Sequence, residues 1–417
     1  MIRLALRNLA RNRWRSGLTF GGVAVAVAAL AWTQGLVEAI VSTTVAGTTS
    51  VQMGDLSIET KAHARDGSMY DTLLASDPLL ARARGVPGVR AVAPRLLAFG
   101  LVGREARSQS ALFIGVDSSA EAAASSVPKA VVDGGWLPHG GFAGAAGRPV
   151  VLGEGLAKLL AARVGDELVA LLQAAYGSMG DDRLRVVGVA RTGTSALDRQ
   201  AAWMRQDDLG YLAALEGQAH TLMVRIERGA DLERTAVALR AALAGAPGPE
   251  LVARTWQELA PDLRQMVQLM DATVGLIYGL VFFVAALGIL NAQRMSALER
   301  RRELAVMMAV GATPARTASL LMLETVLLTA LGAAAGALFG WAAVAWCAHA
   351  GLDLAALGSE NHTSMGVSFS SRMYFVLRPA MVAKPALAVL VVGALSGIWP
   401  ALRSARLELV RAISGRT

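Results

Sequence analysis

Two pairs of adjacent aspartates have the side-chain type that general acid–base chemistry uses. They are Asp181 with Asp182, and Asp207 with Asp208. Adjacent carboxylates in a turn or at a helix start are usually solvated or serve as caps for backbone N–H groups. These two pairs therefore give only a weak indication of catalysis.

The motifs of nucleotide-binding and hydrolytic enzymes are absent from the sequence. It contains no G-x-x-x-x-G-K-[ST] phosphate loop, no H-E-x-x-H zinc motif and no G-x-S-x-G turn. The one cysteine, Cys347, excludes an intrachain disulfide and a thiolate zinc site. His220, His349 and His362 are isolated, without ligand spacing. We therefore expect a chain that is not an enzyme and that carries no metal or cofactor of its own.

A charged segment at residues 296–308 (SALERRRELAVMM) is the most informative one. Its charged start and apolar end predict a short amphipathic helix over 296–311, which Gly311 ends. Pro314 then opens the next helix, at a position where a missing N–H is tolerated. A helix of this kind either lies among lipid headgroups or docks on a soluble partner.

A carboxylate and three glycines mark the apolar run that follows. Glu324 lies about two turns into this run, where a carboxylate must face a helix bundle or the headgroup region. It either pairs with a nearby arginine or takes part in proton or substrate coupling. Gly332, Gly336 and Gly340 repeat the G-x-x-x-G spacing, which lets two helix backbones approach closely. We expect this stripe to serve close helix packing or dimerisation.

Composition indicates that these elements belong to a protein that lies partly in a membrane. Of the 417 residues, 54% are hydrophobic and 17% are charged, whereas soluble domains usually carry about 25% charged residues. Four runs approach the length of about 20 residues that crosses a bilayer as a helix. They are residues 18–36, 272–293, 317–352 with Glu324 as an internal charge, and 385–402. The alternatives are a cleaved signal peptide for the first run and buried soluble helices for the others.

Arginine gathers at the ends of these runs, in residues 1–17, in 294–316 and after Leu402, whereas residues 48–271 are nearly neutral. Cationic flanks stay on the cytoplasmic side of a membrane. We therefore expect both termini and the 294–316 connection in the cytoplasm, and residues 48–271 and 353–384 outside. Nucleic-acid binding, another common use of arginine, is disfavoured because the arginines lie near the ends of the spans.

The block between the first two runs is long enough for one or two folded domains. Its pattern predicts strands at 54–59, 96–103, 111–116, 168–172, 184–190 and 221–227, and helices at 78–84, 156–163, 202–215 and 232–243. The predicted fold class is thus a membrane α-helical protein with four transmembrane helices. A large extracytoplasmic α+β domain, in two lobes, is inserted between the first and second helices.

Four segments together resemble the type VII ABC transporter permeases, which include the macrolide-exporter (MacB-like), FtsX-like and lipoprotein-releasing (LolC/LolE-like) permeases. They are residues 6–17 (LRNLARNRWRSG), 299–313 (ERRRELAVMMAVGAT), 323–340 (LETVLLTALGAAAGALFG) and 399–414 (WPALRSARLELVRAIS). The resemblance implies a cytoplasmic start and first helix over 1–47, a MacB-like periplasmic core over 48–270 and an FtsX-like domain over 271–417. The last domain would place transmembrane helices at about 271–294, 317–351 and 384–402 in a bacterial inner membrane.

The resemblance also implies partners. A separate dimer of ATP-binding subunits, which holds the ATP and magnesium, would grip the predicted amphipathic helix. A second permease, identical or different, would complete the membrane core. The residues that the ATP-binding dimer would grip are Glu299, Arg300, Arg301, Arg302, Glu303, Leu304, Met307, Met308 and Gly311.

Within the family, the chain is most similar to the lipoprotein-releasing permeases, through residues 54–58 (GDLSI) and 374–375 (YF). Members that capture a lipoprotein carrier do so with a hook in the hairpin that matches residues 173–182. The equivalent positions here are Tyr176, Gly177, Ser178 and Met179, in a loop that is short and lacks prolines. The alternatives are a hook on the second permease or no hook at all.

The function that these observations favour is a permease subunit that moves membrane-anchored lipoproteins with energy from a separate ATPase. A second hypothesis keeps the mechanism but changes the cargo, to efflux of a peptide or antibiotic or to regulation of a cell-wall hydrolase. A third hypothesis is a membrane-anchored sensor without an ATPase.

Overall fold

The computed structural model describes Arg11 and residues 13–140, 147–353, 363–364, 367–368 and 372–405. Most of the two predicted cytoplasmic ends, His362 and parts of the 353–384 connection lie outside these residues. By its internal contacts the chain divides into two units. We call Met1–Ser42, Met266–Leu357 and Arg372–Thr417 the helical unit, and Thr43–Gln265 with Gly358–Ser371 the insert domain.

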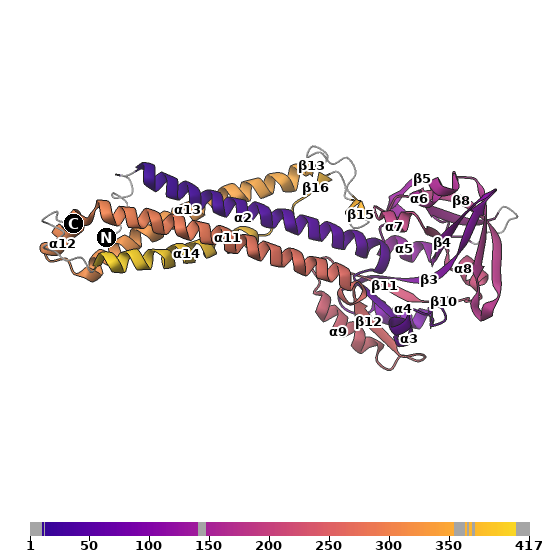
Figure 1. Ribbon diagram of the computed structural model, residues 1–417. Helices are drawn as coiled ribbons and strands as arrows, with labels where there is room; N and C mark the ends of the chain where they lie inside the picture. The colour runs from indigo at the N-terminus through magenta and orange to yellow at the C-terminus, as the bar shows by residue number, and fades with distance from the viewer. Residues whose placement is uncertain are drawn as a thin grey trace. The chain divides into compact units, whose positions relative to one another are not determined.

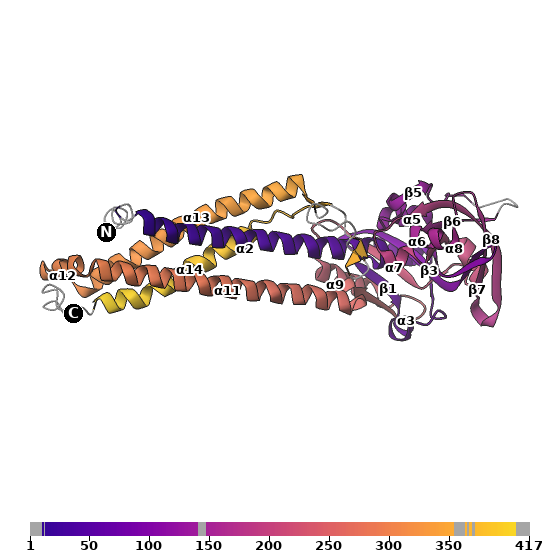
Figure 2. The ribbon, with the colours of Figure 1, turned by 45° about the horizontal axis from the view of Figure 1, so that its top comes forward.

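Four helices in the described residues are long and apolar enough to cross a membrane. They are α2 (Arg13–Thr48), α11 (Pro261–Glu299), α13 (Pro314–Ala350) and α14 (Ala380–Ala405). Figures 1 and 2 show them running alongside one another. The prediction of four transmembrane helices is therefore confirmed in length and composition. Three of them extend beyond the apolar runs that predicted them, because hydropathy marks only the part of a helix that suits lipid.

An apolar core is shared by all four helices of the helical unit. Val27 of α2, Ile289 of α11, Ala333 of α13 and Val389 of α14 are buried together in it. A core to which each helix contributes is the usual basis of a helix bundle.

A small sheet and an aromatic side chain lie between α13 and α14 in sequence. Strand β13 (Leu352–Asp353) pairs with β16 (Arg372–Met373). Phe375 is buried against α2 at Gly35, where a side-chain Cβ would lie 2.8 Å from the phenyl ring. Nearby, Arg378 forms an ion pair with Glu38 of α2, with 3.0 Å between Nη1 and Oε1. These contacts tie the segment before α14 to the first helix.

One sheet organises the described part of the insert domain. Its strands are β1 (Leu56–Thr60), β3 (Val89–Arg104), β4 (Arg107–Val116), β5 (Val131–Gly134), β6 (Arg148–Gly153), β7 (Glu167–Gln173), β8 (Met179–Ala190), β9 (Ala201–Arg205), β11 (Thr221–Ile226) and β12 (Leu251–Thr255). The strand order is β12-β1-β11-β3-β4-β9-β6-β8-β5, and β7 pairs with both β3 and β8. All six predicted strands are present. Two short pairs lie apart from this sheet, namely β2 (Leu73–Leu74) with β10 (Gln218–Ala219) and β14 (Thr363–Ser364) with β15 (Val367–Ser368).

Short helices cover the sheet, which gives the predicted α+β class. They are α3 (Lys61–Asp66), α4 (Asp77–Arg84), α5 (Ser118–Ala124), α6 (Glu154–Leu160), α7 (Ser195–Asp198), α8 (Gln206–Ala213), α9 (Leu232–Leu243) and α10 (Trp256–Leu259), with 3₁₀ turns η2 (Val127–Ala130) and η3 (Ala175–Gly177). Asp231 is the N-cap of α9, since its carboxylate accepts the Arg234 N–H at 3.0 Å.

The predicted helix over 202–215 is wrong in its first part. Residues 201–205 form β9, which lies between β4 and β6 in the sheet. A short apolar run fits a buried strand as well as a helix, and periodicity alone does not separate the two. Residues 201–205 form a strand because they pair in parallel with β4, and the helix α8 begins only at Gln206.

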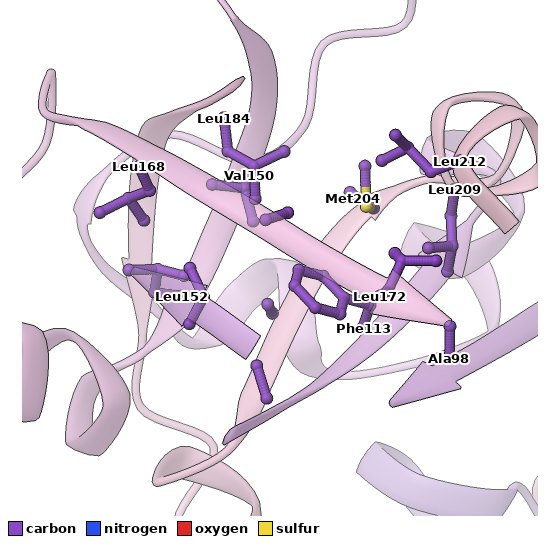
Figure 3. Close-up of a cluster of buried hydrophobic side chains, with 14 of the residues drawn as sticks. Ala98, Phe113, Val150, Leu152, Leu168, Leu172, Leu184, Met204, Leu209 and Leu212 are labelled. Carbon is purple, nitrogen blue, oxygen red and sulfur yellow. The ribbon is translucent and has the colours of Figure 1, made fainter. Parts of the chain in front are cut away.

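The insert domain has two large cores along one sheet, which fits the predicted two lobes. The first lies under β3, β4 and β6–β9 and is covered by α6 and α8. Figure 3 shows Phe113 of this core with its neighbours, among them Leu152, Leu172 and Met204. The second core lies between β1, β11 and β12 and the helices α4 and α9. Strand β3, which is 16 residues long, contributes to both cores and joins them.

One ion pair in this domain predicts a dependence of stability on pH. Glu154 accepts hydrogen bonds from Arg191 at 2.6 and 2.8 Å and from Lys158 at 3.1 Å. The Arg191 guanidinium is the main reason that the pKa of Glu154 falls to about 2. A carboxyl whose pKa is lower in the folded state stabilises the fold above its ordinary pKa, and this contribution disappears as the pH falls toward the folded value.

We therefore expect Glu154→Gln to lower the free energy of unfolding by up to about 1 kcal/mol near neutral pH, the range of surface pairs. Below pH 2 the difference between the variant and the unchanged chain should disappear, because Glu154 then becomes protonated in the folded state as well as in the unfolded state. Urea unfolding of the detergent-solubilised chain at several pH values measures this. A difference that stays constant across the acid range would contradict it.

Candidate coupling site

The connection between α11 and α13 is built around a short helix, α12 (Arg301–Ala309). The backbone leaves helical geometry at Arg300, with φ −101° and ψ 11°, so the predicted helix over 296–311 is divided there. Its first residues, 296–299, continue α11. Gly311 has φ +103°, which favours glycine, and ends the connection before the Thr313 cap of α13.

One face of α12 is anchored in the helical unit and the other is exposed. Leu304 is buried with Leu321 of α13 and Ala401 of α14. On the opposite face, Val306 is 50% exposed and Val310 just beyond the helix end is 84% exposed. Large apolar side chains that stay this exposed on a well-anchored helix are typical of a surface that binds a partner.

A chain of four charged side chains holds the start of α12. Arg300 Nη1 lies 3.0 and 3.1 Å from the two oxygens of Glu324 in α13. Arg300 Nε lies 3.0 Å from Glu303 Oε2, and Glu303 Oε1 lies 2.5 Å from Arg11 Nη2. The Arg300 and Glu324 side chains are only 14% and 6% exposed. The network therefore joins the N-terminal segment, α12 and α13. Its Arg300–Glu324 contact is shielded from water, whereas its Arg11–Glu303 contact is exposed.

The charges of this network reinforce one another. The hydrogen bonds from Arg11 and then Arg300 lower the pKa of Glu303. Burial lowers the pKa of Arg300, but the hydrogen bonds and charges of Glu303 and Glu324 outweigh it, so its pKa lies above the ordinary value. Arg300 is thus charged at any physiological pH, and of the two interpretations of Glu324 the structure contains the pairing with an arginine.

The remaining predicted coupling residues lie around this network. Glu299 ends α11, and Arg302 is exposed on α12. Met307, Met308 and Arg301 are half-buried, and Arg301 Nε has no hydrogen-bond partner among the described residues. The structure thus brings Arg300, Glu303 and Leu304 into contact with other parts of the helical unit, whereas Arg302 and Gly311 are exposed.

Val306 and Val310 belong to the same exposed face but are missing from the predicted site. Their signal is the spacing: Arg302, Val306 and Val310 follow one another at four-residue intervals, which places them on one side of a helix. The prediction named Leu304, Met307 and Met308 from the apolar end of the segment instead, because apolar periodicity does not tell an anchored face from an exposed one.

The glycine stripe of α13 packs against α2 of the same chain. A Cβ at Gly332, Gly336 or Gly340 would lie 2.8–2.9 Å from side-chain carbons of Val23, Val27 or Ala31. That is closer than real Cβ atoms come, so only glycine permits this approach. Of the two expected roles, close helix packing is the one that the described residues contain, and this face of α13 is used within the chain.

The positions matched to a carrier-binding hook form the tip of the β7–β8 hairpin. Gln173 pairs with Met179 at its base, and η3 (Ala175–Gly177), which includes Tyr176, makes the turn. Ser178 Oγ donates to the Ala175 carbonyl at 3.1 Å, and Met179 is exposed. This tip is a compact turn, closed by the Ala174 N–H, which donates to the Ser178 carbonyl at 2.8 Å.

The residues considered for acid–base or ligand chemistry have structural partners. Arg148 binds Asp182 at 2.6 Å and Asp208 at 2.5 Å. Of the pair in the first turn of α8, Asp207 is exposed, as expected, whereas Asp208 is buried in its ion pair instead of being solvated. His220 accepts the Leu97 N–H at 3.0 Å and lies 2.7 Å from the Met69 carbonyl. Burial lowers its pKa, which keeps the ring neutral. Among the described residues no group of three or more His, Cys, Asp or Glu could hold a metal ion.

Two family models match the chain. The MacB-like periplasmic core domain matches residues 16–242, and the FtsX-like permease C-terminal domain matches residues 275–409. Similar solved structures include the extracellular domain of the noncanonic ABC-type transporter YknZ from Gram-positive bacteria, with a TM-score of 0.35, 13% identity and coverage of 48% of this chain and 98% of that one. The periplasmic region of MacB from Actinobacillus actinomycetemcomitans has a TM-score of 0.36, 12% identity and coverage of 51% and 92%.

Curated relatives are similar over part of their length. They include the uncharacterized ABC transporter permease MJ1507 of Methanocaldococcus jannaschii, 26% identical over 38% of this chain and 40% of its own. The lipoprotein-releasing system transmembrane protein LolC of Xylella fastidiosa is 23% identical over 46% of each chain. The chain thus spans less than half the length of the curated relatives it matches. Because the periplasmic core model alone covers more than half of the sequence, the chain belongs to the ABC transporter permeases that combine a MacB-like periplasmic core domain with an FtsX-like permease domain.

Proposed function

We propose that this chain is a non-catalytic permease subunit that converts ATP hydrolysis by a separate cytoplasmic ATPase dimer into movement of the insert domain. It would lie in a bacterial inner membrane with both termini in the cytoplasm and work beside a second permease. The observation that carries the proposal is α12, which is anchored on one face and carries exposed valines on the other.

The anchoring of α12 suits a mechanical role. A partner that pushes on Val306 and Val310 acts on a helix that cannot move alone, since Leu304 is buried and Arg300 is ion-paired with α13. Displacement of α12 would therefore reach α13 directly. ATP and magnesium would be held by the partner, in agreement with the absence of a phosphate loop from this sequence.

The cargo that we favour is a lipid-anchored protein. Exposed apolar side chains line α2 and α11, among them Leu18, Val25, Leu276 and Leu280, and surfaces of this kind can solvate acyl chains. The LolC relatives are named as transmembrane proteins of a lipoprotein-releasing system. A lipoprotein drawn from the outer leaflet would thus find an apolar path along these helices.

A different cargo is the second candidate. The compact tip of the β7–β8 hairpin offers little reach for capturing a lipoprotein carrier. This favours efflux of a peptide or antibiotic, or regulation of a cell-wall hydrolase, by the same movement. Depletion of the chain followed by quantification of inner-membrane lipoproteins separates the two, because lipoprotein retention is expected only for the first candidate.

The coupling role is tested by placing a charge on the exposed valines. We expect Val310→Asp combined with Val306→Asp to weaken binding of the ATP-binding subunit at least tenfold, because a carboxylate desolvated in an apolar contact costs well over about 1.4 kcal/mol. The measurement is recovery of a P-loop ATPase with the tagged chain and its ATPase rate in the complex. Val237→Asp is the matched control, since Val237 of α9 is 62% exposed in the insert domain. Failure of the unchanged chain to retain any P-loop ATPase would end the proposal.

A further inference from the structure

The end of α2, from Thr43 onward, belongs to the insert domain. After Thr48 the helix continues as a π-helical turn, η1 (Thr49–Met53), closed by a hydrogen bond from the Gly54 N–H to the Thr49 carbonyl at 2.8 Å. Gly54 then turns into β1 with φ +78°, and a side chain there would lie 2.7 Å from the Val224 carbonyl. π-Helical turns are rare and concentrate at functional positions.

Outside donors satisfy the carbonyl groups of this turn. A helix end leaves its last carbonyls without partners and carries partial negative charge. The Gln52 carbonyl accepts from Arg95 Nη1 at 2.6 Å, and the Ser50 carbonyl accepts the Ser126 N–H at 2.9 Å. Val51, between them, is buried in a core of the insert domain.

Arg95 is the residue of this junction that joins most elements. It lies in β3, and its Nε and Nη2 donate to the two oxygens of Glu121 in α5 at 3.2 and 2.5 Å. The Arg95 and Glu121 side chains are 4% and 0% exposed. The planar guanidinium therefore donates from Nε and Nη2 to a carboxylate and from Nη1 to the helix end. A lysine ammonium cannot reproduce this combination.

A second arginine binds the same helix end. Arg225 Nη1 lies 3.3 Å from Thr49 Oγ1 and 3.3 Å from Asp55 Oδ1. The Asp55 carboxylate also accepts the Ile226 N–H at 3.0 Å. Arg95 and Arg225 thus clamp the negative end of the helix, and each is itself held by a carboxylate of the domain.

The other connection of the insert domain to a long helix differs. Between α10 and α11 the backbone leaves helical geometry at Ala260, with φ −124° and ψ 75°. Pro261 follows, and a residue before proline is disfavoured in the helical region. Pro261, Asp262, Arg264 and Gln265 are all exposed. This entry is a bend on the surface, whereas the entry of α2 is buried and clamped.

We propose that Arg95 is a positioning residue that locks the end of the first membrane-spanning helix to the insert domain, so that α2 drives this domain as a rigid lever. The bend at Ala260 lets α11 follow. The mechanical consequence rests on the proposed function, but the lock itself is a property of the chain alone. A movement of α2 would reach β3 and α5 without being absorbed at the junction.

Hydrogen exchange of the full chain in lipid nanodiscs tests the lock without any partner. We expect Arg95→Lys to speed exchange of the amides between Val51 and Gly54 at least about tenfold, which corresponds to about 1.4 kcal/mol of local opening free energy. Exchange in β4 and β9 should be unchanged. Arg148→Lys is the matched control, because Arg148 also bridges two carboxylates of this domain but lies elsewhere, and it should leave the 51–54 amides protected.

Two results would overturn the proposal. One is exchange between Val51 and Gly54 that Arg95→Lys does not change; the other is a rise spread evenly over the domain, which would mark Arg95 as an ordinary stabilising residue. In complex with its ATPase, the Arg95→Lys variant should keep the ATPase rate within about twofold. It should lower the amount transported per ATP at least about fivefold, which corresponds to a coupling free energy of about 1 kcal/mol. Unchanged transport per ATP would refute the lever, whereas an unchanged chain that binds no ATPase would refute the proposed function instead.

Discussion

Replacing Gly336 by leucine is expected to abolish the packing of α13 on α2. A Cβ at this position would lie 2.8 Å from Val27 Cβ, and it would also meet the Ala24 carbonyl, which is backbone and cannot rotate away. The two helices must then separate, and the neighbouring contacts at Gly332 and Gly340 are lost with them. We expect the free energy of unfolding to fall by about 3 kcal/mol or more, at the upper end of the cost of overpacking.

Thermal unfolding of the chain in detergent measures this loss, and Gly279→Leu provides the control. Gly279 belongs to a G-x-x-x-G pair of α11, but a Cβ built there would meet no other helix or strand of the described residues within 4 Å. The same substitution should therefore leave the isolated chain nearly as stable as before. Equal melting of the two variants would show that the α2–α13 contact does not hold the helical unit together.

The contrast between the glycines of α13 and those of α11 shows how much of the helical unit the sequence predicts. The spans follow from hydropathy, and the spacing of Gly332, Gly336 and Gly340 correctly predicts a close helix contact. The spacing is equally good at Gly275 and Gly279, yet nothing in the described residues packs there. A stripe of glycines predicts that another helix can pack closely against it. Which helix does so depends on residues far away in sequence.

The sheet of the insert domain shows the same limit. Strands with clear alternation or length, such as β7 and β11, are predicted within a few residues. Strand β9 is predicted as a helix because its assignment depends on β4 and β6, which lie about 50 or more residues away and pair on either side of it. Local pattern predicts which segments are buried, and long-range pairing decides their secondary structure.

The charged residues divide in a similar way. The sequence predicts that Glu324 needs an arginine, because an unpaired carboxylate in an apolar helix is too costly. It does not identify Arg300 as the partner, since several arginines lie close in sequence. Arg95 and Glu121 carry no signal at all: they look like surface charges of a strand and a helix, and only the folded structure buries them together.

The ion pair between Arg300 and Glu324 is expected to hold α12 to α13. Glu324→Ala would leave the Arg300 guanidinium, which is 14% exposed, without its buried carboxylate. Removing one partner of a buried pair usually costs about 3–5 kcal/mol, because the other charge stays desolvated. Arg300 would then turn toward solvent, and the start of α12 would lose its connection to α13.

We therefore expect Glu324→Ala to lower the melting temperature strongly and to leave ATP hydrolysis by the complex less coupled to transport. Glu303→Ala is the matched control, since it removes the solvent-exposed half of the same network and should cost no more than about 1 kcal/mol.

A double substitution separates the cost of a stranded charge from the value of the pair. Arg300→Met with Glu324→Met removes both charges and keeps apolar volume, so stability should return to nearly that of the unchanged chain. Transport per ATP should stay low, because two methionines can pack α12 against α13 but lack the directional hydrogen bonds of the ion pair. If the double variant regains transport together with stability, the network only stabilises the helical unit and the force passes through the packing of Leu304 instead. If stability returns and transport stays low, the Arg300–Glu324 pair is the element through which α12 moves α13.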